Sequence, residues 1–206
     1  MNPPSTSLHT ARPPLSFSVV AAAHARCLFL APCTQQQLYA ALPLPADDQA
    51  VLVYPSGRTV LTDWQSAADA PSSVELVHLP AAQDADLSAL PVPLQLDLEQ
   101  ALLPGSRAAV SALDGAHALL ISDDDALLRA GLRAALAQLG PLPPIPDATL
   151  DVLLRADDWA HHHDVSLQAG RRYWTLQIDR RGPSGVQTTR LVCEGPGGHW
   201  RVGWTW

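Results

Sequence analysis

The sequence predicts an α+β protein in two parts: a small strand-rich domain, then a mixed region that ends in a Trp-rich antiparallel sheet. Three observations support this prediction. Apolar runs of strand length, separated by turn residues, recur through the chain. Two segments combine helix caps with helical spacing of apolar residues. A Pro-, Ala- and Asp-rich stretch at residues 81–96 is the expected linker within the 206 residues.

The first elements follow a Pro-rich leader. Residues 1–14 contain four prolines and no apolar periodicity, so we expect them to be disordered. Residues 16–22 and 25–31 are apolar runs that predict a β-hairpin. Thr34 is placed to N-cap a short helix at residues 35–42, which the prolines after it would end.

Three more strands are expected before the linker, at residues 50–54, 58–61 and 74–79. A Pro-Ser-Gly turn joins the first two of them. Residues 15–80 therefore read strand, strand, helix, strand, strand, strand, and this order resembles bacterial ubiquitin-like β-grasp domains. The resemblance implies a domain in which a sheet of four or five strands wraps one helix.

The resemblance also implies what the domain does. Sulfur carriers and conjugated modifiers of the ubiquitin-like class use a free C-terminal Gly-Gly, whereas this chain ends in Trp204-Thr205-Trp206. Carrier or modifier chemistry is therefore not expected, and a binding role is what the resemblance implies.

Residues 97–206 are expected to form the second, α+β domain, starting with a short helix at residues 97–103. The dipeptide Asp114-Gly115 predicts a hairpin between strands at residues 110–113 and 116–122. The clearest helix follows, with Ser122 as the expected cap, Gly140 at its end and a leucine-rich stripe between them.

Residues 118–140 resemble the opening of a response-regulator receiver domain, with Asp123 and Asp124 as its acidic pair. The chain has no lysine to hold a phosphoryl group, and too few residues follow for the rest of that domain. We therefore interpret the carboxylates as the start of a helix, where the helix dipole favours negative charge.

The last 60 residues predict an antiparallel meander with strands at residues 150–154, 165–168, 173–179, 187–193 and 200–206. Alternation places Trp200, Val202, Trp204 and Trp206 on one face of the last strand. These tryptophans, with Arg201 beside them, are the candidate binding residues because tryptophan and arginine are enriched at interaction hot spots.

The charge balance excludes several functions. All 13 basic residues are arginine, so no Schiff-base lysine, P-loop lysine or Ser–Lys dyad exists. A net charge of −7 disfavours nucleic-acid binding, and no apolar run is long enough to predict membrane insertion. The lack of lysine is typical of a GC-rich bacterial genome, and three cysteines without disulfide-type spacing favour a cytoplasmic location, although residues 1–14 also suit a delivery signal for secretion.

The most unusual cluster spans residues 157–164 and contains three consecutive histidines between aspartates. Asp157 and His161 would share a helical face, whereas His161 and His163 would share one side of a strand. Either arrangement could bind zinc, but no established metal motif is present, so a polar loop is the main interpretation. No metal and no other cofactor are expected.

The function predicted by elimination is a non-catalytic protein–protein interaction component, such as an adaptor or chaperone-like accessory protein of a bacterial secretion or assembly system. Its partner is another protein of unknown identity. One alternative is a metal-dependent hydrolase centred on Asp157, His161 and His163. Another is an effector or toxin-related protein that is delivered to a second cell.

Overall fold

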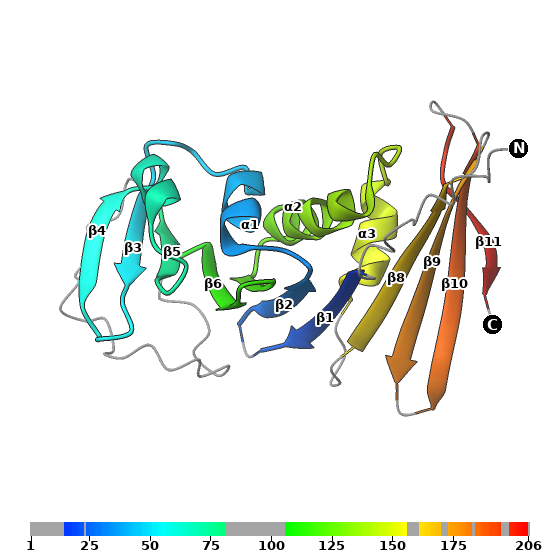
Figure 1. Ribbon diagram of the computed structural model, residues 1–206, viewed down its shortest axis with the longest axis horizontal. Helices are drawn as coiled ribbons and strands as arrows, with labels where there is room; N and C mark the ends of the chain where they lie inside the picture. The colour runs from blue at the N-terminus through cyan, green and yellow to red at the C-terminus, as the bar shows by residue number, and fades with distance from the viewer. Residues whose placement is uncertain are drawn as a thin grey trace, which may run out of the picture.

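The described residues form one antiparallel sheet of eleven strands with three α-helices on one of its faces (Figure 1). The computed structural model describes residues 15–22, 24–80, 106–155, 161–169, 173–182, 184–194 and 198–205. The predicted α+β class is confirmed. The expected leader, the linker at 81–96 and the helix at 97–103 lie outside the described residues.

The first part of the chain contains the elements in the predicted order. They are β1 (Leu15–Ala21), β2 (Arg26–Ala31), α1 (Gln35–Ala41), β3 (Gln49–Val53), β4 (Thr59–Asp63), the 3-10 helix η1 (Gln65–Asp69) and β5 (Glu75–Leu79). Thr34 caps α1 as predicted, because its hydroxyl accepts a hydrogen bond from the Gln37 amide at 3.2 Å. The Gln37 side chain accepts one from the Thr34 amide at 2.9 Å, which completes a capping box.

The second part begins with the predicted hairpin about Asp114-Gly115. Its elements are β6 (Ala108–Asp114), β7 (His117–Ser122), α2 (Asp125–Leu136), η4 (Ala137–Leu139), α3 (Asp147–Leu153), β8 (His161–Ala169), β9 (Tyr173–Gly182), β10 (Gly185–Glu194) and β11 (Arg201–Thr205). The last four strands form the expected antiparallel meander.

The strand predicted at residues 150–154 is wrong, because these residues belong mainly to α3. An apolar run of five residues fits a strand and a short helix equally well. Two signals favoured the helix: Pro146 stands at its N-cap, and Asp147 lies in its first turn. Leu150 and Leu153 then face the core together at helical spacing.

The two parts of the chain share the sheet. The strand order is β11-β10-β9-β8-β1-β2-β7-β6-β5-β3-β4. The hairpin β1–β2 is thus separated from β5, β3 and β4 by two strands of the second part. The likeness of residues 15–80 to a ubiquitin-like domain is one of element order, since these strands do not pair into a sheet of their own.

The centre of the sheet is the antiparallel pair β2–β7, where Leu28 lies opposite Leu120. Each of these strands belongs to a hairpin that is followed by a helix: β1–β2 by α1, and β6–β7 by α2. The two helices pack against each other above the pair (Figure 1). Gly131 lets α2 lie close to both the sheet and α1, because a Cβ there would be 2.8 Å from Cδ2 of Leu120 in β7 and 3.1 Å from Cδ1 of Leu38 in α1.

Two apolar clusters lie on opposite faces of the central strands. The larger one joins the three helices to the sheet, and residues such as Phe17, Leu28 and Leu120 belong to it. The smaller one contains Cys27, Leu119 and neighbours from β3, β5 and β6, and no described helix contributes to it. Several central strands are therefore apolar on both faces, which explains their continuous apolar sequences.

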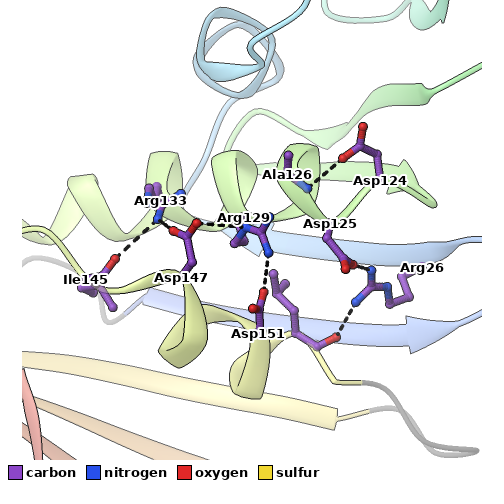
Figure 2. A network of polar contacts seen from close by, with 10 residues as sticks. Arg26, Asp124, Asp125, Ala126, Arg129, Arg133, Ile145, Asp147 and Asp151 are labelled. Carbon is purple, nitrogen blue, oxygen red and sulfur yellow. Dashed lines mark hydrogen bonds and ion pairs between the residues drawn. The ribbon is translucent and has the colours of Figure 1, made fainter.

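Arginines of α2 connect that helix to α3 (Figure 2). Arg129 donates to Asp151 at 2.7 Å and lies 3.7 Å from Asp147, which also pairs with Arg133. The hydrogen bond from Arg133 lowers the pKa of the Asp147 carboxyl. Pairs this exposed contribute little free energy each, so we assign them to the alignment of the two helices.

The N-terminus of α2 differs from the prediction by two residues. Asp124 is the cap, and its carboxylate accepts a hydrogen bond from the Ala126 amide at 2.8 Å (Figure 2). Ser122, the predicted cap, instead ends β7 and accepts a hydrogen bond from the Asp124 amide at 3.0 Å. Asp125 pairs with Arg26 and so joins the helix to β2.

No helix within the described parts of the chain is long and apolar enough to cross a membrane.

Candidate functional site

The expected Asp/His cluster does not form one site among the described residues. Asp157 and the side chain of His161 lie outside them. His163 is buried in the helix-side core, where its ring stacks on Phe17 at a centroid distance of 4.4 Å. His162, its neighbour on β8, lies on the opposite face. The described residues contain no group of three His, Cys, Asp or Glu side chains that could hold a metal ion.

The predicted C-terminal binding residues lie in different surroundings. Trp200 is buried, and its indole N–H donates to the carbonyl of Pro143 at 3.1 Å. Arg201 is exposed, with its guanidinium 3.5 Å from Glu194. The Trp204 side chain and Trp206 lie outside the described residues. Trp200 thus anchors the start of β11 to the core, whereas Arg201 is exposed to solvent.

A groove of about 470 Å³ lies on the face of the sheet that is opposite the helices. In β1, the core residues Leu15, Phe17 and Val19 alternate with residues that point into this groove, as the period of a strand requires. Polar and apolar side chains both line the groove. They include Ser18, His162, His117, Val20, Phe29 and Leu113.

Ser18, His162 and Asp164 form a hydrogen-bonded chain in and beside this groove. Ser18 lies directly opposite His162 in the β1–β8 ladder, and its Oγ is 2.9 Å from Nδ1 of the imidazole. The other ring nitrogen, Nε2, is 3.2 Å from Oδ1 of Asp164, two residues further along β8. Arg181 of β9 donates to Oδ2 of Asp164 from Nε and Nη2, at 3.0 and 2.8 Å.

A second imidazole in the groove is also held by a carboxylate. Nδ1 of His117 lies 2.7 Å from the carboxylate of Asp114, across the hairpin turn. Asp114 further accepts the backbone amides of Ala116 and His117 at 2.8 and 2.9 Å. Hydrogen bonds from Ala116 and His117 lower the pKa of the Asp114 carboxyl, so it stays an anion that orients the ring.

Ser18, His162 and Asp164 combine a hydroxyl, a base and an orienting carboxylate, which together can activate the hydroxyl as a nucleophile. The cysteines offer no competing nucleophile, since all three are buried. Burial raises the pKa of the Cys33 thiol to about 11 and also raises that of Cys27, which disfavours the reactive thiolate.

A larger cavity, of about 630 Å³, lies between the end of α2 and the Pro-rich segment that follows it. Its lining is mainly apolar, and the guanidinium of its one charged residue, Arg133, is paired with Asp147. Because ligand sites combine an apolar surface with polar groups that converge on the ligand, the groove with Ser18 is the stronger candidate.

The hydrogen bonds that join Ser18, His162 and Asp164 could not be predicted from the sequence, because they depend on how distant strands pair. Ser18 and His162 are 144 residues apart, and only the β1–β8 pairing brings them together. The sequence did contain a local signal for the other half of the site. His162 and Asp164 are two residues apart in a strand and therefore share a face.

A third Asp–His pair, formed by Asp48 and His78, is buried beside Trp64 and is structural. His78 is fully buried, and its Nε2 lies 2.7 Å from Oδ2 of Asp48. The Trp64 ring contacts the imidazole edge to face at a centroid distance of 5.2 Å. Burial lowers the pKa of His78 below its ordinary value, so the imidazole is neutral in the fold and donates its Nε2 proton to Asp48.

The stability of the fold is therefore expected to fall at acidic pH. His78 binds a proton more weakly in the folded chain than in the unfolded chain, so its contribution is complete above about pH 6.5. That contribution is lost as the pH falls from about 6.5 towards the lower pKa of the folded state, with a slope of at most about 1.4 kcal/mol per pH unit. Urea unfolding at pH 7.5, 6.5 and 5.5 measures the slope.

The matched variant is His78→Gln, whose amide can still donate to Asp48 but does not titrate. We expect a smaller slope in this variant than in the wild-type protein. Equal slopes in the two proteins would show that His78 does not cause the pH dependence.

Comparisons of the chain with protein-family models, with curated proteins and with solved structures each found no match.

Proposed function

We propose that this protein is a protein–protein interaction component, an adaptor or chaperone-like accessory protein of a bacterial secretion or assembly system. The observation that carries the proposal is the edge of β11, the last strand in the sheet order. Among the described residues, β11 pairs with β10 alone, so its other edge can accept an extended segment of a partner.

The exposed side chains of β11 support this role. Val202 is 64% exposed and Arg201 is exposed beside it, so a partner strand meets an apolar contact and a cation. Buried Trp200 fixes where the strand begins, which reduces the entropy that binding would cost. An unprotected edge with an apolar side chain is a surface that natural proteins normally block unless it is used.

The acidic composition and the ubiquitin-like element order of residues 15–80 favour the same class of function. A net charge of −7 suits contacts with basic proteins and repels nucleic acid.

Replacing Val202 by lysine is expected to weaken partner binding, because a charged side chain on an edge strand opposes addition of another strand. Affinity capture from lysate of the source bacterium, followed by titration of the purified partner, measures the effect. We expect the dissociation constant to rise at least about tenfold, equivalent to about 1.4 kcal/mol.

Val186→Lys is the matched control, since Val186 is 59% exposed on β10, where it pairs with Arg181 of β9, and it lies outside the residues of β10 that pair with β11. This variant should keep the partner. Capture of the same proteins by wild type and both lysine variants, with equal affinities, would contradict docking on β11.

A further inference from the structure

We propose that Ser18 is an activated nucleophile that accepts the acyl group of a small apolar ester, with His162 as its base and Asp164 as the carboxylate that orients the imidazole. This activity goes beyond partner binding at β11 and does not depend on it, because the groove lies over β1, β2 and β8.

The geometry of the three side chains carries the proposal. With a proton on Nε2, His162 donates to Asp164 across 3.2 Å, and Nδ1 is then free of a proton and accepts the Ser18 hydroxyl across 2.9 Å. Arg181 bonds to the far oxygen of Asp164 and so fixes the carboxylate. This is the order nucleophile, base, orienting acid that acyl-transfer sites share, with the two ring nitrogens exchanged relative to the serine-protease arrangement.

The surroundings of Ser18 select the substrate class. The groove holds about 470 Å³, and Val20 and Phe29 give it an apolar wall beside the hydroxyl, while Leu113 of β6 lines it further away. That volume suits a ligand of modest size. A short aliphatic or aromatic acyl group can cover this wall while its carbonyl carbon meets the hydroxyl.

Acylation needs only Ser18, His162 and the ester. Ser18 Oγ forms a bond to the carbonyl carbon as its proton passes to Nδ1 of His162. The tetrahedral intermediate then expels the alcohol, which takes that proton as its bond to the acyl carbon breaks. Water, which gives a proton to the same nitrogen, later attacks the acyl carbon. The bond from that carbon to Ser18 Oγ then breaks, Oγ takes the proton back from Nδ1, and the acid leaves.

Stabilisation of the oxyanion is the weaker part of this site. Ser18 lies in β1, whose backbone pairs with β2 on one side and with β8 on the other. His117, the imidazole that Asp114 holds, lines the same groove but lies on β7, two strands away from Ser18. Because the backbone of a doubly paired strand does not offer two amides to one carbonyl oxygen, we expect the acyl-serine to be hydrolysed slowly.

The first test uses a fluorophosphonate probe and intact-mass spectrometry of the full chain. In that reaction Ser18 Oγ bonds to phosphorus, fluoride leaves and His162 takes the proton. We expect one adduct, located at Ser18 by peptide mapping. Ser18→Ala should lose it, while Ser56→Ala should keep it, because Ser56 is exposed in the turn between β3 and β4 and does not line the groove.

The second test is the burst of p-nitrophenolate from p-nitrophenyl butyrate. The wild-type protein should release about one equivalent rapidly and then continue slowly. Asp164→Asn should slow the burst about 100- to 10,000-fold while leaving the thermal unfolding temperature within a few degrees, as expected when a carboxylate positions a base. No adduct on the wild-type protein, or equal labelling of Ser18→Ala, would overturn the proposal.

Discussion

Leu120→Ala is expected to lower the free energy of unfolding by about 3–5 kcal/mol, the upper part of the range for buried leucine truncations. Leu120 is fully buried at the centre of the sheet, opposite Leu28 in the β2–β7 pair. Helix α2 lies directly above it, since Cδ2 of Leu120 would be 2.8 Å from a Cβ at Gly131. The cavity left by truncation is therefore enclosed by strands and a helix that cannot easily close it.

Urea unfolding followed by tryptophan fluorescence measures this loss. The control is Leu61→Ala, because Leu61 is 38% exposed on the edge strand β4 and its truncation should cost about 1 kcal/mol or less. Equal losses for the two variants would contradict the central position of Leu120 in the core.

Local patterns predicted most strands and helices because they depend on neighbouring residues. Asp114-Gly115 marked its hairpin, and Thr34 marked the start of α1. The pairing of strands across the chain could not be predicted in this way. Strands such as β2 and β7 are apolar on both faces, so they carry no polar side that would show which strands lie beside them.

The candidate site was predicted in part only. The histidines of β8 were singled out as one cluster, but strand alternation divides it: His162 faces the groove and His163 faces the core. The nucleophile proposed for this groove, Ser18, has no motif around it. Its partner is set by the β1–β8 register, which is a property of the whole sheet.

Gly131→Val is expected to destabilise the fold by about 2–3 kcal/mol, because the added atoms overpack a core that is already filled. A Cβ at this position lies 2.8 Å from Leu120 and 3.1 Å from Leu38, and valine adds two methyl groups beyond it. The higher helix propensity of valine returns only a few tenths of a kcal/mol. Urea unfolding of the single variant measures the balance.

The contact between Leu120 and position 131 predicts that Leu120→Ala and Gly131→Ala are coupled in their effects on stability. In the Leu120→Ala protein, the atom that a Cβ at Gly131 would meet at 2.8 Å is gone and only the 3.1 Å contact with Leu38 remains, so Gly131→Ala should there add up to about 1 kcal/mol of helix stability. In the wild-type background the alanine has to displace Leu120 and should add less than that. A double-mutant cycle should therefore give a coupling of at least about 0.5 kcal/mol. Strict additivity would show that α2 does not pack on Leu120 through Gly131.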